Sequence, residues 1–348
     1  SANPLNIKIA DGATLDIKAS GTGKLFAIDA KNGLQVDGGK LKLDLYSGTN
    51  AYGAINMTAA DNTKVANINS DVDIAVDSTG TGFSGYTLGM YISKGTLNLN
   101  GDLTIKNGDQ PGVKNSSGTK PDYYGWIDVY STNGAKINLS NVDIISGGEG
   151  LYANNNGSVI NVAGGSIIHT EDDAKYYALR AAGASINVNM NEDNTAAAGN
   201  KTVIEGNITT QTDWVNINSD ATKDTVINLG LNTNDSSFHG IAYNAFGNDG
   251  IEKSNKTTTK TFNGGINMWL QEGATWTNED KSTSGEHKGT YGGVAFAGEG
   301  SHLAKLTGGS TEGKAGVIFQ KDANPITIDN YSGNTKVMYE HTNDGDEA

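Results

Sequence analysis

A short signature recurs along this 348-residue chain and constrains its fold more than any other feature. It consists of a glycine, a small residue and, shortly afterwards, an asparagine between two apolar residues, and its clearest copies span 134–139, 157–162 and 183–188. The apolar-Asn-apolar triplet alone returns at 97–99, 215–217, 227–229 and 266–268, with variants at 5–7, 15–17 and 55–57. Intervals of roughly 23 and 26 residues separate the clearest copies, and repeats of that period are typical of solenoid proteins.

Side chains alternate within each copy of the signature. In the first copy Ile137 and Leu139 share one side while Lys136 and Asn138 share the other, which is the period of two expected of a half-buried strand. A single short strand cannot bury its apolar side alone, whereas stacked copies would join their apolar sides into continuous columns. The repeat therefore predicts a stack of coils around an elongated core.

The corners of such coils need residues that tolerate unusual backbone angles. Glycine adopts these angles freely and asparagine does so next most readily, and runs such as Asn154 to Gly157 supply both. No segment of twelve or more residues carries a helical apolar period. We therefore predict an all-β chain folded as a right-handed parallel β-helix, with coils of roughly 20–26 residues stacked about 4.8 Å apart into a rod on the order of 65 Å long.

A solenoid grows by adding coils to one core, so the repeat predicts a single domain over residues 1–348. Four stretches fail to fit a coil and are predicted to project as loops, where we expect function to lie: 107–124, 191–200, 247–263 and 278–293. The acidic end 341–348 is expected to be a frayed tail, as in a chain cut from something longer.

Charge and composition limit the partners. The net charge of −14 would repel phosphate backbones and anionic membrane surfaces, so no nucleic acid is expected as a partner. The chain has no cysteine, which removes disulfides and thiolate metal sites. No window approaches the ~18 consecutive apolar residues of a membrane helix, and any targeting or anchoring element is expected to lie outside this sequence.

One cluster invites comparison with polysaccharide-degrading enzymes. His169, Glu171, Asp172 and Asp173 lie close in sequence to Arg180, the sole arginine, and paired carboxylates beside such residues can perform acid–base chemistry on a sugar. The alternative is a polar corner between two strands. We favour the corner, because the further motifs that such enzymes carry are only approached at 232–235 and 238–240, and we predict no catalytic residues.

Cofactor and metal motifs are also weak. Residues 80–85 match the dinucleotide-binding glycine pattern, but an alternating, strand-like segment follows where a helix would have to begin, so we interpret them as a corner. Calcium-binding glycine-aspartate repeats are absent and the five histidines are isolated from one another. We therefore expect no cofactor and no metal.

An aromatic group is the strongest candidate for a binding surface. It comprises Tyr123, Tyr124, Trp126 and Tyr130, together with Asp128. Flat rings can stack on sugars or anchor a protein partner, while a carboxylate accepts hydrogen bonds. Alternation places Trp126, Asp128 and Tyr130 on one face, and Asp128 favours the outer face. Alternatively, the rings fill the core or form a stacked ladder; for Trp269, Trp276, Tyr176 and Tyr177 we favour such packing.

The coils, the Asn- and Gly-rich corners, the lack of cysteine and the stretch 326–341 together resemble the passenger region of bacterial type V autotransporters. The resemblance extends over most of the chain but is one of style, and no single motif is diagnostic of one member. It implies export by a signal peptide, translocation by an outer-membrane β-barrel at the C-terminus of the full-length chain, and display at the cell surface, anchored to the outer membrane. The catalytic motif of the serine-protease members is absent, so that activity is not carried over.

These observations predict a surface-displayed adhesin, associated with virulence, that binds a host or bacterial glycan or protein through loops on a β-helical rod, with possible self-association of rods. Two alternatives stay open. One is a β-helical polysaccharide-degrading enzyme with its site near Asp172, Asp173 and Arg180. The other is a structural stalk that presents a functional tip outside this sequence.

Overall fold

The fold is all-β and is described here from a computed structural model. The structure describes residues 3–47, 53–78, 87–107, 126–155, 157–170, 177–191, 195, 197, 199–211, 225–244, 264–281, 290–291, 294–295, 300–321 and 325–339. Within these ranges the only helical turn is a three-residue 3-10 segment, Glu312–Lys314, and no helix is long and apolar enough to cross a membrane.

Two parallel sheets contain almost all of the strands. Sheet A has 18 strands: β1 Leu5–Lys8, β2 Thr14–Gly21, β4 Leu34–Ser47, β6 Val65–Ser78, β8 Thr96–Asn107, β10 Lys136–Ser146, β12 Val159–Val162, β13 Ser166–Thr170, β15 Ser185–Val188, β16 Thr202–Glu205, β18 Thr225–Leu231, β19 Ser237–His239, β21 Gly264–Leu270, β22 Thr275–Asn278, β25 Ser301–Thr307, β26 Gly316–Gln320, β27 Ile326–Ser332 and β28 Thr335–Tyr339. Sheet B has eight: β3 Phe26–Asp29, β5 Gly53–Thr58, β7 Thr87–Ser93, β9 Trp126–Thr132, β11 Glu149–Asn154, β14 Leu179–Ala182, β17 Ile208–Gln211 and β20 Ala242–Asn244. A short antiparallel pair, β23 Thr290–Tyr291 and β24 Val294–Ala295, stands apart.

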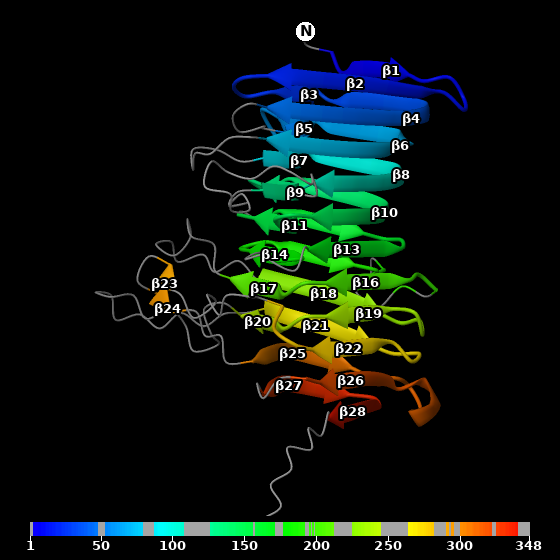
Figure 1. Cartoon of the computed structure of the whole chain (residues 1–348), viewed down its shortest axis with the longest axis vertical. Coiled ribbons are helices and arrows are strands. Elements are labelled where there is room, and N and C mark those ends of the chain that lie inside the picture. Colours follow the sequence, from blue (N-terminus) through cyan, green and yellow to red (C-terminus); the bar gives the residue numbers. More distant parts are fainter. Residues whose placement is uncertain are drawn as a thin grey trace, which may run out of the picture.

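The chain passes repeatedly from sheet A to sheet B and back, and most strands of the two sheets pair in parallel with the equivalent strand one circuit later. For example, β10 pairs with β12 through its first half and with β13 through its second half, while in sheet B β9 pairs with β11 and β11 with β14. The strands therefore succeed one another along the long axis of the molecule in chain order (Figure 1). This arrangement confirms the predicted all-β chain with parallel strands.

Apolar side chains from successive circuits form columns in register, as the repeat predicts. One column is built from a single buried position of sheet A: Ile17, Leu43, Ile74, Ile105, Ile144, Ile168, Ile204, Phe238, Trp276, Ile318 and Val337. Nearly all of its interior members are fully buried, including Ile144 and Trp276 at 0% exposure. These columns belong to one continuous core cluster that extends through the whole stack.

The asparagine of the signature forms a second kind of column, on the outer side of the same strands. Each side-chain amide donates to the amide oxygen of the preceding circuit, at 2.7–2.9 Å, along the series Asn67, Asn98, Asn138, Asn161, Asn187, Asn228 and Asn267. Stacked amides of this kind occur where identical residues of parallel strands lie in register. The signature therefore specifies an apolar column on the inner side of its strands and an amide ladder on their outer side.

The corners before the signature strands use the predicted backbone angles. Gly134, Gly157 and Gly183 have φ of 79°, 70° and 60°, and the residues before the first two corners include Asn133 and Asn155, also at positive φ. Glycine and asparagine are the residues that adopt this left-handed region at least cost. The small residue that follows each glycine, Ala135 in the first copy, is buried beneath the corner.

The predicted length of one circuit, roughly 20–26 residues, is too short for most circuits. The separations between successive ladder asparagines are 31, 40, 23, 26, 41 and 39 residues, so coils of roughly 20–26 residues describe only the two shortest. The extra residues lie between strands and leave the register of the columns intact. Of the triplets, 55–57 belongs to sheet B, where Asn56 bonds Asp29 at 2.9 Å, and 215–217 lies outside the described residues.

The predicted loops fall mostly outside the described residues. Asn107 and Asn278 were assigned to loops but are the last residues of β8 and β22, and both are buried. Most of 107–124, all of 247–263, much of 278–293 and the tail 341–348 lie beyond the described ranges, as do several residues of 191–200.

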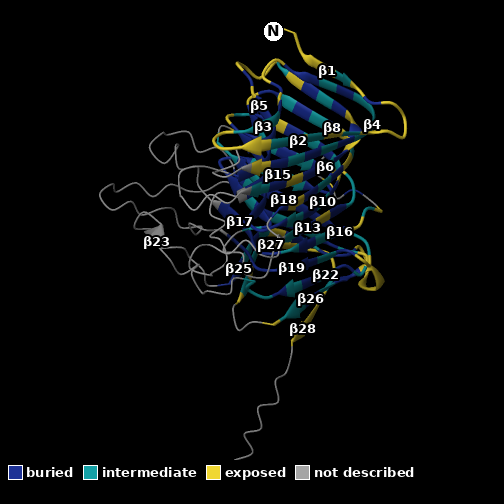
Figure 2. Ribbon diagram, turned by 45° about the horizontal axis from the view of Figure 1, so that its top comes forward, coloured by how far each residue is buried: buried dark blue, intermediate teal, exposed yellow. Residues whose placement is uncertain are grey.

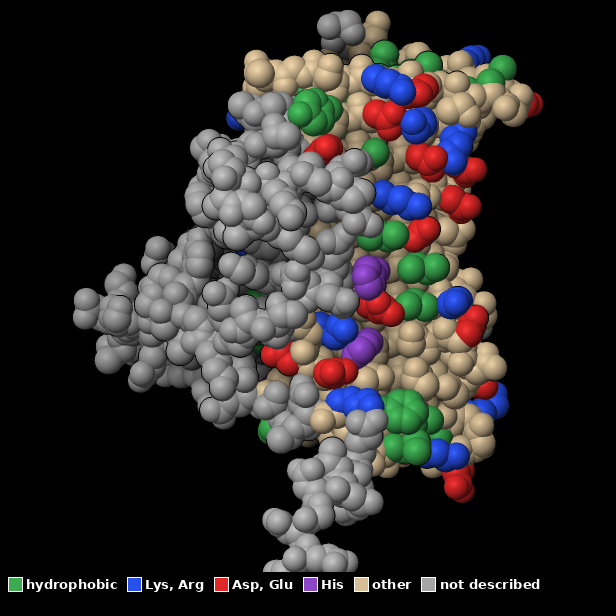
Figure 3. All heavy atoms as spheres, viewed as in Figure 1, with side chains coloured by type: hydrophobic (Ala, Val, Ile, Leu, Met, Phe, Trp, Pro, Cys, Tyr) green, Lys and Arg blue, Asp and Glu red, His purple; other side chains and the backbone are tan. Residues whose placement is uncertain are grey.

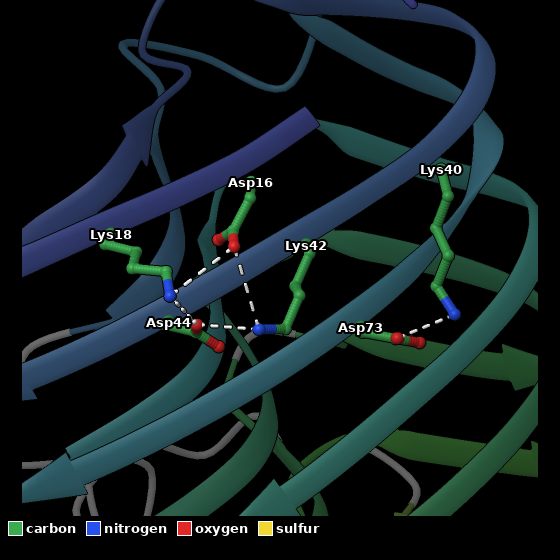
Figure 4. A network of polar contacts seen from close by, with 6 residues as sticks. All are labelled: Asp16, Lys18, Lys40, Lys42, Asp44 and Asp73. Atoms are coloured by element: carbon green, nitrogen blue, oxygen red, sulfur yellow. Dashed lines mark hydrogen bonds and ion pairs between the residues drawn. The ribbon is translucent and has the colours of Figure 1, made fainter. Parts of the chain in front are cut away.

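The outer face of sheet A near β1 carries alternating charges. Lys42 pairs with Asp44 at 2.8 Å and approaches Asp16 at 3.8 Å, and Lys18 approaches both carboxylates (Figure 4). All four side chains are at least a quarter exposed, so these pairs contribute little to stability, about 0–1 kcal/mol each.

Candidate binding surface

The outer face of sheet B carries a row of aromatic and charged side chains. Tyr91, Tyr130, Tyr152 and Arg180 occupy equivalent positions of β7, β9, β11 and β14. Because parallel strands bring equivalent residues about 4.8 Å apart, the four side chains stack on one another. We call this row the tyrosine ladder.

The tyrosine ladder is closely packed. The rings of Tyr130 and Tyr152 are parallel within 2° with centroids 5.0 Å apart, and Tyr91 lies 5.4 Å from Tyr130 at a tilt of 43°. On the other side of Tyr152, the guanidinium carbon of Arg180 lies 4.5 Å from the ring centroid, which is cation–π geometry. Both faces of Tyr152 are therefore covered by neighbours within the protein.

Arg180 is also the centre of a buried ion pair. Its Nη1 donates to Oε1 of Glu149, whose side chain is only 7% exposed. Burial raises the pKa of the Glu149 carboxyl, and the guanidinium opposes that shift. Burial is the largest effect on Arg180 and disfavours its charged form, but Glu149, Tyr152 and Tyr177 together outweigh it and keep the guanidinium pKa above its ordinary value. Arg180 is therefore charged at neutral pH.

Two further tyrosines complete this region. Tyr243 of β20 is buried, and its hydroxyl donates to that of Tyr177 at 2.9 Å. Burial raises the pKa of Tyr243 well above its ordinary value, so the hydroxyl stays protonated. Tyr177 is half-buried and its ring centroid lies 5.8 Å from the Arg180 guanidinium carbon. Arg180 therefore lies between two tyrosine rings and beside a carboxylate.

The chemistry that this face offers follows from how its side chains pack. Sugar recognition by stacking needs an open ring face, and the interior members of the tyrosine ladder have none. Tyr91, Tyr152 and Tyr177 are half-buried. In addition, Oε2 of Glu149 is buried without a hydrogen-bond partner. The face is therefore suited to polar, edge-on contacts.

Only some of the predicted binding residues lie among the described residues. Tyr123 and Tyr124 lie outside the described residues, and Trp126 begins β9 with a side chain that is not described. Tyr130 is 8% exposed and forms part of the tyrosine ladder, which is the alternative that the sequence left open. A ligand that meets Tyr130 would meet its edge, since stacked neighbours cover its faces.

Asp128 requires a correction. It was expected on the outer face, where it would accept hydrogen bonds from a ligand, but it is 1% exposed. It accepts a hydrogen bond from Nδ2 of Asn107, the last residue of β8, and a second comes from Ser146. Burial raises the pKa of its carboxyl well above the ordinary value despite these hydrogen bonds, and Oδ2 has no partner. Asp128 is therefore a buried acid bonded by residues of neighbouring strands, and the expectation that it lies on the outer face is wrong.

The two described residues that were considered for polysaccharide chemistry, His169 and Arg180, lie in different sheets and contact different carboxylates. His169 belongs to β13 of sheet A, where its Nδ1 contacts Oε2 of Glu205. Arg180 belongs to β14 of sheet B and pairs with Glu149. Asp172 and Asp173 lie outside the described residues. The guanidinium that a sugar carboxylate would need is thus occupied by a carboxylate of the protein itself.

Histidine–carboxylate pairs recur on the outer side of sheet A. His169 contacts Glu205, His239 contacts Glu279 at 2.7 Å and His302 contacts Asp329 at 2.9 Å, each acid lying on or just after a strand of the next circuit. Figure 3 shows histidine and acidic side chains close together on this face. Among the described residues no three His, Asp or Glu side chains gather into a set that could hold a metal ion.

The remaining aromatic candidates are largely structural. Trp276 is fully buried and stacks on Phe238 with centroids 5.9 Å apart, while its indole donates to the carbonyl of Gly240 at 3.0 Å. Trp269 is half-buried beneath the Lys305 ammonium, 5.7 Å from its ring centroid. Tyr176 lies outside the described residues. Trp276 confirms the expected core packing.

The sequence analysis did not single out Tyr91, Tyr152 or Glu149. A signal was present, because Tyr91 and Tyr130 each lie four residues before a corner glycine and Tyr152 five residues before one. Comparison of the chain with protein-family models, with curated proteins and with solved structures found no match. The functional argument therefore depends on the chain's own residues.

Proposed function

We propose that the chain winds as a right-handed parallel β-helix and is a segment of a surface-displayed bacterial adhesin passenger. The parallel register of both sheets, the unbroken columns and the variable length of the circuits support this winding. The resemblance to autotransporter passengers supports display at the outer membrane by a β-barrel translocator in the full-length protein.

The outer face of sheet B is the proposed recognition surface. The observation that carries this assignment is the grouping of Tyr152, Tyr177 and Arg180, all half-buried, beside the buried carboxylate of Glu149. Hydroxyl-rich glycans and polar protein surfaces are bound by partly exposed tyrosine and arginine side chains of this kind. Strands β7, β9 and β14 begin at the same edge of this sheet, so the segment that carries Tyr123 and Tyr124 joins β9 there and is proposed to contribute contacts.

Binding of the whole chain to a glycan array and to host and bacterial cells tests this function. We expect binding above that of a scrambled-sequence control, and we expect Tyr123→Ala combined with Tyr124→Ala, or Tyr152→Ser alone, to reduce it by about tenfold or more. Tyr46→Ala is the matched control, because Tyr46 is 46% exposed but lies on sheet A. Binding equal to the scrambled control would favour a structural stalk instead.

A further inference from the structure

One side chain on the outer face of sheet A departs from the repeat. Buried and less buried residues alternate along the strands of this sheet, as the banding in Figure 2 shows. Trp269 of β21 lies on the outer side, since both of its neighbours in the strand are buried. The equivalent residues of adjoining circuits are all small: Gly230, Thr307 and Ser332. Positions at which a chain departs from its own pattern are often functional.

The indole N–H of Trp269 has no hydrogen-bond partner among the described residues. Trp276, by contrast, is fully buried and donates its indole N–H to the carbonyl of Gly240. The Trp269 nitrogen is also not one of the buried polar atoms that lack a partner, so solvent reaches it. Trp269 therefore has a donor that a ligand can use.

The indole ring of Trp269 has different surroundings on its two sides along the stack. In the following circuit, the Lys305 ammonium of β25 lies 5.7 Å from the ring centroid. In the preceding circuit, the equivalent residue is Gly230, which has no side chain to cover the ring. No other aromatic ring of the described residues stacks on Trp269. The ring therefore meets the condition for sugar stacking that the interior members of the tyrosine ladder do not meet.

The amide ladder ends beside Trp269. The residue that follows Asn267 in the column is Lys305, so Oδ1 of Asn267 accepts no hydrogen bond from the following circuit. Lys305 is exposed and forms no ion pair among the described residues. An amide oxygen accepts hydrogen bonds from hydroxyls, and an ammonium forms its strongest hydrogen bonds with ionised acceptors such as carboxylates.

The charges around Trp269 favour an acidic ligand locally. Strands β18, β21 and β25 contain no Asp or Glu, and Lys305 is their only Lys or Arg. In the next strand, β27, Asp329 is paired with His302 at 2.9 Å. The net charge of −14 opposes acidic ligands at long range, but the screening length at physiological ionic strength is about 8 Å. The ammonium in direct contact therefore decides the preference.

We propose that Trp269, Lys305 and Asn267 form a subsite for a sugar that carries a carboxylate. The pyranose ring packs on the indole, and the Asn267 amide and the indole N–H bond its hydroxyls. Lys305 turns from the ring to pair with the carboxylate, a movement that its flexible stem permits without any change in the backbone. The subsite lies on sheet A and includes no residue of the tyrosine ladder, so it goes beyond the proposed recognition surface, and either can fail without the other.

Titration of the whole chain with matched sugars tests this subsite. The probes are oligomers of glucuronic, galacturonic and mannuronic acid, and the same oligomers after reduction of their carboxyl groups to alcohols. We expect at least one acid oligomer to bind about fivefold or more tighter than its reduced form. Trp269→Ala should weaken that binding by about tenfold or more. Lys305→Gln should remove the preference for the carboxylate, and Lys305→Arg should retain it.

Two control variants and one spectroscopic variant complete the test. Lys136→Gln, at an exposed lysine elsewhere on sheet A, and Tyr152→Ser, in the tyrosine ladder, should both leave acid binding unchanged. Trp269→Phe keeps an aromatic ring, so it should retain binding but lose the change in tryptophan fluorescence that the ligand produces. No binding to any acid oligomer, equal binding of acid and reduced oligomers, or binding unaffected by Trp269→Ala would overturn the proposal.

Discussion

Removing one amide from the middle of the asparagine ladder gives a quantitative test of the repeat. Asn161 donates to Asn138 at 2.8 Å and accepts from Asn187 at 2.8 Å, so Asn161→Ala deletes two hydrogen bonds. Each is worth about 0.5–1.5 kcal/mol net, and the ladder is half-buried, which lets water replace part of each bond. We expect a loss of about 1–2 kcal/mol in the free energy of unfolding.

The end of the amide ladder supplies the internal control. Asn267 donates to Asn228 at 2.9 Å and has Lys305, not another asparagine, as its next neighbour in the column. Asn267→Ala should therefore cost about half as much as Asn161→Ala. Urea unfolding monitored by circular dichroism measures both, through the shift of the midpoint at constant slope.

A double-mutant cycle separates the ladder from general effects of the substitution. Asn138→Ala combined with Asn161→Ala should cost less than the sum of the two single variants, because the bond between them is lost only once. Equal costs at Asn161 and Asn267, or strict additivity in the cycle, would show that the amides do not act as a connected ladder and would refute the reasoning.

Three further predictions concern burial and charge. Asp128→Asn should raise the midpoint of thermal unfolding at pH 7 and leave it unchanged below about pH 3.8. Because the pKa of Asp128 is raised in the folded state, the wild type is most stable with this carboxyl protonated and loses stability as the pH rises above the pKa of the unfolded state. A variant less stable than the wild type at pH 7 would contradict the assignment. Ile144→Ala, at a fully buried core position, should lower the free energy of unfolding in urea by about 2–5 kcal/mol. The control Ile167→Ala, at a residue of the adjacent strand that is 41% exposed, should change it by no more than about 0.5 kcal/mol. Comparable losses would argue against the core column. Arg180→Met should cost about 3–5 kcal/mol, because it leaves the buried Glu149 carboxyl without its ion-pair partner, and adding Glu149→Gln should recover most of this loss in the same assay.

The sequence was informative wherever the same residue types recur at the same register. The apolar-Asn-apolar triplets at 137–139, 160–162 and 186–188 specify strand, core side and outer side together, and all three lie in register in the structure. The positive φ of Gly134, Gly157 and Gly183 could be predicted as well, since few other residues adopt it without strain.

The sequence was less informative where a column is mixed. Gln35 lies in the asparagine column but is not an asparagine, and the triplet Ala66-Asn67-Ile68 follows Thr63 where the signature has its glycine, so the first circuits were harder to recognise. Circuit lengths above about 30 residues were missed because insertions between strands leave no periodic signal.

The binding surface was the hardest part to predict. Alternation alone placed Asp128 outside, because it ignores the partners that other strands supply: Asn107 from β8 and Ser146 from β10. Similarly, nothing local to Arg180 indicates that Glu149 lies beside it, 31 residues earlier in the chain. Contacts between circuits depend on how many residues each circuit contains, which the sequence does not state directly.

The unequal circuits have a practical consequence for protein engineering. Steps of 23 and 41 residues leave adjacent ladder amides at the same 2.7–2.8 Å spacing, so the scaffold tolerates added surface peptide without loss of alignment. Doubling the length of a flexible connection costs only about 0.6 kcal/mol in closure entropy. A foreign epitope inserted between two strands would therefore keep a fixed position along the long axis of the stack, so the molecule is suited to peptide display.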